Sequence, residues 1–225
     1  MQLNADFSKR VALHADKIEW RSSPTPGVHR RMLDRIGDEV ARATSIVRYD
    51  PDSLFPAHVH GGGEEFVVLD GVFQDEHGDY PAGTYVRNPP TSHHTPGSKP
   101  GCTILVKLWQ FTPDDRCHVI IDTGRIGAVP HRDRPGVAVT PLFRDDREDV
   151  RLERWQASTA ARIAWRGGAE LFVLDGGFSE AGDRFRLHSW LRLPDDGETV
   201  ATAGPNGAAV WIKTGHLRFA EPPRP

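Results

Sequence analysis

The sequence predicts an all-β protein that contains two copies of one β unit. Short runs rich in β-branched and aromatic residues alternate with turns that hold many of the 22 glycines and 18 prolines, which is typical of short strands joined by tight turns. An internal repeat is the second observation, because GGEEFVVLDGVF at 62–73 aligns with GGAELFVLDGGF at 167–178, an offset of 105 residues. A chain of 225 residues is long enough for two small domains.

The repeat extends beyond this stretch. At the same offset Arg87 aligns with Arg192, and further matches follow in the same order, which indicates a duplicated unit. We therefore predict one domain at residues 1–128 and a second at residues 129–225. The two units are expected to pair within the chain as subunits of a dimer do, and two chains could associate further into a homodimer.

Residues 29–42, which precede the repeated stretch, have a pattern that fits two kinds of secondary structure. Residues 29–42 are spaced as an amphipathic helix or as two strands joined by a turn at Ile36-Gly37-Asp38. Glycine inside a helix costs about 1 kcal/mol relative to alanine, so the pattern favours strands. Further strands are predicted at 43–51, 83–89 and 102–111.

The first copy carries a group of metal-binding side chains. His58 and His60 are two residues apart, so on a strand they point to the same face. Three glycines then allow a tight reversal that brings Glu64 beside them, and a further strand returns the chain to His94. Each histidine alone is more often a surface or core residue, but together they predict a metal site with nitrogen and oxygen ligands, namely His58, His60, Glu64 and His94.

His93 is the main alternative for the last ligand, because it adjoins His94. Side chains alternate along a strand, so if His94 points into the barrel then His93 points out. In the second copy the four ligand positions hold residues that cannot ligate a transition metal through nitrogen or carboxylate. They are Ile163, Trp165, Ala169 and Thr199. The second unit is therefore predicted to lack the metal and to fill its barrel with apolar side chains.

The motifs of the first copy resemble those of the cupins. The first cupin motif, G-x5-HxH-x3,4-E-x6-G, is met by His58, His60, Glu64 and Gly71, without its leading glycine. The second, G-x5-PxG-x2-H-x3-N, is met loosely by Gly83 and the histidine pair, with PPTSHH in place of PxG-x2-H. The resemblance covers about residues 20–112 and is to the ChrR-type cupins. It implies a double-stranded β-helix, or jelly roll, repeated twice as a bicupin.

The ChrR-type cupins include the zinc-binding domain of an anti-sigma factor and relatives of acetylacetone-cleaving dioxygenases. This resemblance implies one divalent transition metal per chain, which could be zinc, iron, manganese or nickel. The acetylacetone-cleaving enzymes use three histidines, whereas this chain also has Glu64. The anti-sigma factor carries an HxxxCxxC zinc motif in a separate helical domain, and this chain has no such motif. Direct inhibition of a sigma factor is therefore not expected.

Three functions are compatible with these residues. The first is a metal-dependent dioxygenase that acts on a small enolisable diketone or phenolic substrate, with Glu64 as fourth ligand or as catalytic base. A redox-capable metal would suit this chemistry, whereas zinc would suit hydrolysis, isomerisation or a structural role. The second is a non-catalytic sensor or regulatory cupin of the ChrR type, and the third is a metal-stabilised scaffold. All except the scaffold predict a small-molecule ligand.

Composition excludes several other classes. The net charge of −3 argues against nucleic-acid or anionic-membrane surfaces. No apolar run has the length of a membrane span, and the first residues lack the apolar core of a signal peptide, so we expect a cytoplasmic protein. Cys102 and Cys117 are the only cysteines and do not form a CxxC motif, which excludes a sulfur-based zinc finger.

Overall fold

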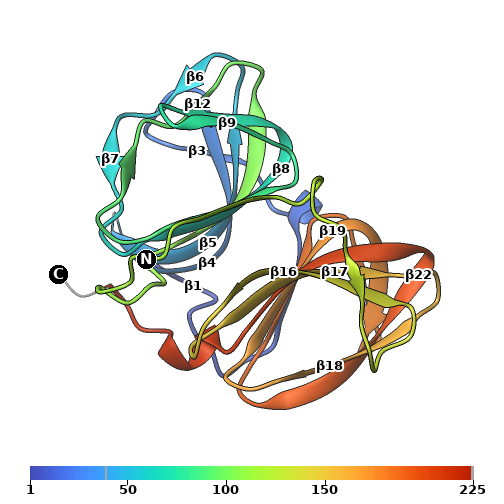
Figure 1. The fold of residues 1–225 in the computed structure, drawn as a ribbon. Helices are drawn as coiled ribbons and strands as arrows, with labels where there is room; N and C mark the ends of the chain where they lie inside the picture. Colours follow the sequence, from blue (N-terminus) through green and yellow to red (C-terminus); the bar gives the residue numbers. More distant parts are fainter. Residues whose placement is uncertain (39, 224–225) are drawn as a thin grey trace. The chain divides into compact units, whose positions relative to one another are not determined.

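The computed structural model describes residues 1–38 and 40–223, and these residues form almost only β-strands (Figure 1). The chain divides into two compact units. The first comprises Met1–Ala5, Ile18–Arg125 and the segment that starts at Glu221, and the second comprises Asp6–Lys17 and Ile126–Ala220. All strand pairs are antiparallel among the described residues, so the predicted all-β class is confirmed.

The first unit contains one 11-stranded sheet and one two-stranded sheet. The main path of the large sheet runs β1-β4-β5-β13-β8-β10-β14, and the small sheet is β7 with β11. The strands are β1 Gln2–Leu3, β3 Arg21–Ser22, β4 Val28–Gly37, β5 Ala41–Tyr49, β6 Ser53–Leu54, β7 His58–Val59, β8 Glu64–Asp75, β9 Gly78–Pro81, β10 Thr84–Asn88, β11 His93–His94, β12 Gly97–Ser98, β13 Cys102–Leu108 and β14 Val119–Asp122.

The second unit contains one nine-stranded sheet, whose main path runs β15-β16-β17-β22-β19-β21-β2. Its strands are β2 Val11–His14, β15 Val129–Pro130, β16 Val137–Arg144, β17 Asp149–Trp155, β18 Ala160–Trp165, β19 Ala169–Glu180, β20 Asp183–Arg186, β21 Ser189–Leu193 and β22 Gly197–Thr214. Two short 3-10 helices complete the elements, at Ala15–Lys17 and His216–Phe219. None of the described helices is long and apolar enough to cross a membrane.

Strands β14 and β2 take equivalent places at the ends of the two main paths, although β2 precedes the first repeat in the chain. In the first unit, Val119 of β14 lies opposite Arg87 of β10. In the second unit, Val11 of β2 lies opposite Arg192 of β21. The structural units therefore differ from the predicted ones at residues 1–128 and 129–225, because the N-terminal segment with β2 joins the second unit. The pairing of β2 with β21 joins residues far apart in the chain, so no local sequence pattern could have predicted it.

The duplication read from the sequence recurs in the register of the sheets. Glu64 of β8 lies opposite Asn88 of β10, and Ala169 of β19 lies opposite Leu193 of β21. All of these partners differ by the same 105 positions found in the sequence alignment. Corresponding residues of the two units therefore occupy the same places in the two sheets.

The two units differ most where the first carries its histidines. There β7 and β11 form a ladder of only two residues each. The corresponding strand of the second unit, β18, pairs over six residues with the continuous strand β22. Prolines interrupt this region of the first unit at positions 89, 90, 96 and 100, and proline cannot donate a ladder hydrogen bond.

Each unit has its own apolar core. The core of the first unit consists of Val28, Val47, Tyr49, Phe66, Val68, Phe73, Tyr80, Val86, Cys102, Ile104 and Val106. The core of the second includes Ile163 and Ala169, and the partly buried Trp165 packs against it. The expectation that apolar residues fill the second barrel at the former ligand positions is therefore confirmed for these three positions.

The segment at 29–42 forms strands, as predicted. β4 continues to Gly37 and β5 begins at Ala41, so Ile36 and Gly37 of the expected turn Ile36-Gly37-Asp38 belong to the strand. Gly37 has a φ of 116°, a conformation that glycine adopts readily. Both cysteines are free thiols, with Cys102 buried and Cys117 exposed.

Candidate metal centre

The short strand pair of the first unit places two of the predicted ligands face to face. In the register of β7 and β11, His58 lies opposite His94, and Val59 lies opposite His93. His94 is 2% exposed, whereas His93 is exposed at the surface. The structure therefore brings His94 into the cluster and leaves its neighbour outside it, as the alternation of side chains requires.

His60 and Glu64 complete the cluster from the two sides of a glycine-rich reversal. The backbone N–H of His60 donates to the carbonyl of Ser92 at 2.9 Å, which holds His60 beside β11. Gly63 has a φ of 77°, and a Cβ there would lie 1.5 Å from Cδ2 of Phe111. Only glycine fits this close approach, and Glu64 then begins β8.

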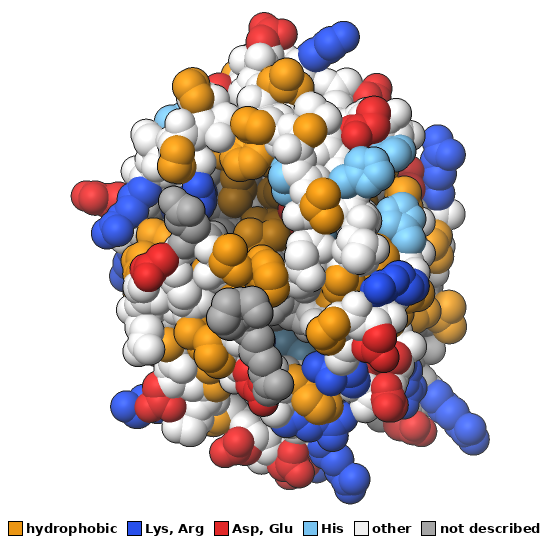
Figure 2. All heavy atoms as spheres, turned by 90° about the vertical axis from the view of Figure 1, so that its left-hand side faces the viewer, with side chains coloured by type: hydrophobic (Ala, Val, Ile, Leu, Met, Phe, Trp, Pro, Cys, Tyr) orange, Lys and Arg blue, Asp and Glu red, His pale blue; other side chains and the backbone are white. Residues whose placement is uncertain are grey.

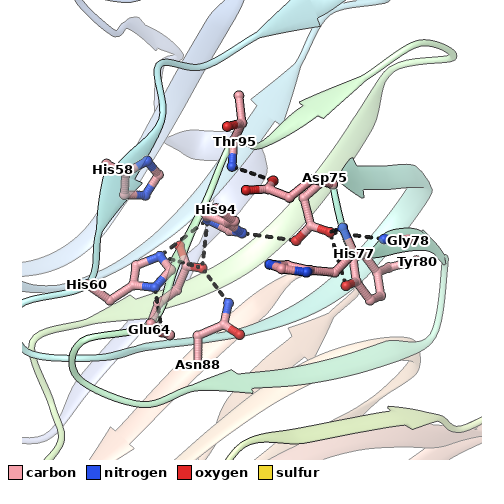
Figure 3. Close-up of polar contacts among 12 residues, drawn as sticks. His58, His60, Glu64, Asp75, His77, Gly78, Tyr80, Asn88, His94 and Thr95 are labelled. Carbon is pink, nitrogen blue, oxygen red and sulfur yellow. Dashed lines mark hydrogen bonds and ion pairs between the residues drawn. The ribbon is translucent and has the colours of Figure 1, made fainter.

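The four side chains converge on one point (Figure 3). One ligand atom from each of His58, His60, Glu64 and His94 lies within 4.8 Å of all the others. Nε2 of His60 lies 3.2 Å from Nε2 of His94, and Oε2 of Glu64 lies 3.3 Å and 3.5 Å from these two atoms. Ligands about 2.1 Å from one ion are about 3 to 3.4 Å apart in octahedral or tetrahedral sites. The separations fit a single transition-metal ion.

The outer nitrogen of each histidine ring is already hydrogen-bonded. The three pairs are His58 Nδ1 with Pro56 O at 3.0 Å, His60 Nδ1 with Ser92 Oγ at 2.9 Å, and His94 Nδ1 with Asp75 Oδ2 at 3.1 Å. A metal-binding histidine usually engages its second ring nitrogen in this way, which fixes the ring and its tautomer.

These partners place the proton of each neutral ring on Nδ1. The carbonyl of Pro56 and the carboxylate of Asp75 can only accept hydrogen bonds. Ser92 donates its own hydroxyl proton to the carbonyl of Pro89 at 2.6 Å, so it accepts from His60. In all three neutral rings Nε2 therefore keeps its lone pair, which is the state that a metal ligand requires. In His60 and His94 this atom faces Glu64.

The fourth group is an ionised carboxylate. Burial by itself would raise the pKa of Glu64, but in the metal-free protein the hydrogen bond and charge of protonated His60, the charge of protonated His94 and the amide of Asn88 lower it to about 2. Nδ2 of Asn88 donates to Oε2 of Glu64 at 3.2 Å, and Oδ1 of Asn88 is 3.0 Å from Nε2 of His118. The cluster thus combines one negative oxygen donor with three imidazoles.

The histidine pKa values shift in opposite directions. Burial lowers the pKa of His58 and favours its neutral form. Burial also acts to lower the pKa of His94, but the hydrogen bond to Asp75 and the negative charge of Glu64 outweigh it, so this pKa is raised. A proton and a cation therefore compete for Nε2 of His94.

The cluster is open on the side of His58. His60 is 5% exposed and Glu64 is 7% exposed, whereas His58 is half-buried and its ring lies 5.4 Å from that of Phe55. Figure 2 shows histidine side chains at the surface of one face, beside hydrophobic side chains and a hollow. Within residues 1–38 and 40–223, this is the only group of three or more potential ligands found together.

The second unit lacks two of the groups that contact the ligands, as well as the ligands themselves. The position of Asn88 is taken by Leu193 and that of Ser92 by Gly197. The sequence analysis did not single out Asn88, Ser92 or Asp75, although each contacts a ligand. Comparison of the two repeats could have found the first two, because side chains that disappear together with the ligands are candidates for the same site.

Comparison with known proteins gives a family match for the first repeat. Residues 8–112 match the family model described as the ChrR cupin-like domain. This segment is similar to that domain. The matched residues include β2, which pairs in the second unit. Comparison with curated proteins gave no match.

Solved structures extend the similarity from the ChrR cupin-like domain to nearly the whole chain. A proposed dioxygenase from Nostoc punctiforme is 14% identical with a TM-score of 0.75, over 94% of this chain and 84% of that one. YhhW from Escherichia coli is 11% identical with a TM-score of 0.67, over 92% and 97%. Salicylate 1,2-dioxygenase from Pseudoaminobacter salicylatoxidans is 11% identical with a TM-score of 0.56, over 77% and 68%. Such identities show the fold alone, and the predicted cupin fold is confirmed.

Proposed function

We propose that this chain is a metal-dependent enzyme of the dioxygenase type. Its substrate would be a small enolisable diketone or phenolic molecule that chelates through neighbouring oxygen atoms. The observation that carries the proposal is the convergence of one ligand atom from each of three imidazoles and one carboxylate within 4.8 Å, with every Nδ1 hydrogen-bonded elsewhere. These donors suit iron, manganese, nickel or zinc.

The residues have distinct roles in this proposal. His58, His60 and His94 would hold the ion through Nε2, and Glu64 would be the fourth ligand. A divalent transition metal bound there would supply Lewis-acid and redox chemistry, with coordination positions left for substrate oxygen atoms. The pKa of Glu64, about 2, favours the ligand role, because a general base works best when its pKa lies near the working pH. Service as a base would require Glu64 to leave the ion.

The surroundings of the cluster suit a small molecule with an apolar body. Phe55 and Leu108 are partly buried and pack on the core of the first unit. Leu108 lies opposite Glu64 in the register of β13 and β8, and the ring of Phe55 lies beside His58. A substrate that approaches from the side of His58 would therefore meet hydrophobic surface next to the metal ligands, which is typical of small-molecule sites.

Two of the similar structures support this choice without deciding it. One is the proposed dioxygenase from Nostoc punctiforme, and the other is a salicylate 1,2-dioxygenase solved as adducts with gentisate. One fold commonly hosts many functions, so these neighbours make dioxygenase chemistry the first reaction class to test.

The test begins with the metal. Protein produced without added metal is analysed for its elements, then stripped and reloaded separately with iron, manganese, nickel and zinc. Oxygen consumption is measured with a panel of β-diketones and dihydroxyaryl ketones. We expect consumption that depends on a redox-capable metal and is lost in His60→Ala. No turnover of any compound with any of the four metals would reject the proposal.

The match to the ChrR cupin-like domain favours one alternative, a regulatory cupin that binds a small molecule without converting it. This alternative predicts that a compound from the panel raises the thermal stability of the zinc-loaded protein. The same compound would be recovered unchanged after incubation with any metal form. Product formation would exclude a purely regulatory role.

A further inference from the structure

Asp75 is the last residue of strand β8, and its two carboxylate oxygens have different hydrogen-bond partners and different roles (Figure 3). Its Oδ2 is 3.1 Å from Nδ1 of His94. Its Oδ1 accepts the backbone N–H of His77 at 2.8 Å, the backbone N–H of Gly78 at 3.1 Å and the hydroxyl of Tyr80 at 3.1 Å. The side chain is 5% exposed, so this carboxylate is both buried and fully engaged.

The first task belongs to the turn. β8 and β9 are joined by Glu76 and His77, and Asp75 lies opposite Gly78 in the ladder. An aspartate that accepts from the backbone N–H two residues later stabilises such a turn. In the second unit, the corresponding turn is formed by Ala181 and Gly182, whose φ angles are 48° and 88°. That turn uses left-handed residues and needs no carboxylate to close it.

The second task belongs to His94. Four donors converge on one carboxylate, and three of them hold Oδ1, so the direction of Oδ2 toward the ring is fixed. A carboxylate can only accept, so Asp75 requires the proton of neutral His94 to be on Nδ1 and leaves Nε2 free for the ion. No other contact of Nδ1 is needed to orient the ring.

The metal-free repeat provides an internal comparison. Thr199 stands at the position of His94, and its hydroxyl donates to Glu180, which stands at the position of Asp75, at 2.8 Å. A carboxylate is therefore present in both units, but in the second unit Glu180 forms an ion pair with Arg10 at 2.7 Å. The hydroxyl of Tyr80 is absent, because Phe185 occupies that place opposite Phe178. In the unit without metal ligands, the acid is thus joined to an arginine and has lost one of its donors.

We propose that Asp75, held in place by Tyr80, is the positioning residue of the metal centre, which sets the tautomer and orientation of His94. This inference rests on the proposed metal site and is independent of whether the protein is catalytic. Asp75 acts through His94 and does not contact the ion or the substrate.

Asp75→Asn separates the two tasks of the side chain. Asparagine keeps an oxygen that can close the turn, but it presents an NH2 group to His94. An NH2 donor favours the ring with its proton on Nε2, and that tautomer cannot bind a metal through Nε2. Loss of such an outer partner typically lowers metal affinity about 10–100-fold. A residue needed only for the turn would leave metal affinity unchanged in this variant.

The first measurement is zinc affinity, by competition with a chromogenic chelator on the full chain. We expect a loss of about 10–100-fold for Asp75→Asn and a smaller loss for Tyr80→Phe. Glu180→Gln, the matched change in the second unit, should bind zinc as the unaltered protein does. Equal affinity in Asp75→Asn and the unaltered protein would overturn the proposal.

The second measurement needs no variant and no metal. In metal-free protein labelled with 15N-histidine, NMR of the ring nitrogens at alkaline pH should show His94 protonated on Nδ1. A proton on Nε2 in the unaltered protein would contradict the proposal, even if Asp75→Asn failed to fold. Where that variant folds, we expect the proton of His94 to move to Nε2. Neither readout depends on turnover, so an inactive enzyme would leave the proposal standing.

Discussion

Asn88 and Glu64 lie opposite each other in the register of β10 and β8, and the amide Nδ2 of Asn88 donates to Oε2 of Glu64 at 3.2 Å. The same pair of positions in the second unit holds Leu193 and Ala169. The amide is therefore present where the carboxylate is present, and both are replaced by apolar side chains in the repeat that has no ligands.

Asn88→Leu should weaken metal binding without unfolding the protein. Leucine has the same number and branching of side-chain heavy atoms as asparagine and is the natural residue at this place in the second repeat. Loss of the hydrogen bond leaves Glu64 less well oriented, and we expect zinc affinity to fall about 10-fold. Competition with a chelator measures this change, and an affinity equal to that of the unaltered protein would contradict it.

The reverse change, Leu193→Asn, is the matched control. Leu193 is 5% exposed within the core of the second unit, where an amide would find no carboxylate at the position of Ala169. A buried unsatisfied polar group costs about 1–3 kcal/mol, so the free energy of unfolding should fall while zinc affinity stays constant. Urea unfolding and the same competition assay separate these two effects.

His60→Ala should remove most of the bound metal, whereas His188→Ala should not. His60 supplies an Nε2 atom to the cluster, while His188 lies in the second unit with its ring stacked on Phe172 at 5.6 Å. Elemental analysis of the two purified variants gives the metal content per chain. Equal contents would reject the assignment of the site.

The pKa of Glu64 predicts how the metal-free protein responds to acid. This pKa is lowered from its ordinary value of 4.5 to about 2 in the folded state. The folded state therefore favours the ionised carboxylate, and the stability that results is present above pH 4.5 and is lost as the pH falls toward 2. Urea unfolding should show a free energy that declines over this range.

Glu64→Gln isolates that contribution, because glutamine does not titrate. Its free energy of unfolding should depend less on pH between 4.5 and 2 than that of the unaltered protein. Identical pH dependence in the two proteins would show that the carboxylate is not ionised preferentially in the folded state. The comparison is made with a chelator present, so that metal binding does not contribute.

Gly63→Ala should destabilise the first unit and disturb the position of Glu64. Its φ of 77° and the ring of Phe111 leave no room for a Cβ. An alanine forced into a left-handed conformation is expected to cost more than about 1 kcal/mol. A fall in both the thermal midpoint and zinc affinity would agree with this reason. Gly127→Ala is the control, since no atom lies within 4 Å of a Cβ built there, and it should leave both quantities unchanged.

The spacing of the sequence was sufficient to find the candidate ligands. His58, His60 and Glu64 lie close together in the chain, and strand alternation decides which way each side chain points. Spacing and alternation are local properties, set by a period of two residues and a glycine-rich turn, and they do not depend on the rest of the fold. Alternation allows only one of His93 and His94 to point inward, and the choice of His94 came from the resemblance to the cupins.

The duplication was also visible in the sequence, and with it the apolar replacement of the ligands in the second repeat. Both copies conserve a buried glutamate with the same kind of partner, for Glu65 accepts from the hydroxyl of Tyr85 and Glu170 accepts from Nε1 of Trp190. The occurrence of this pair in the metal-free unit indicates a structural role for Glu65.

Only the tertiary structure decided which strands complete each sheet and which groups surround the ligands. β2 pairs with β21 across the repeat boundary. Backbone hydrogen bonds carry no residue code that fixes a distant partner, so this pairing could not be predicted from the sequence. The partner of His94 lies 19 positions away in Asp75, at a distance that no strand or helix period specifies. The sequence by itself determined which atoms can bind a metal, and the fold determined which way their protons point.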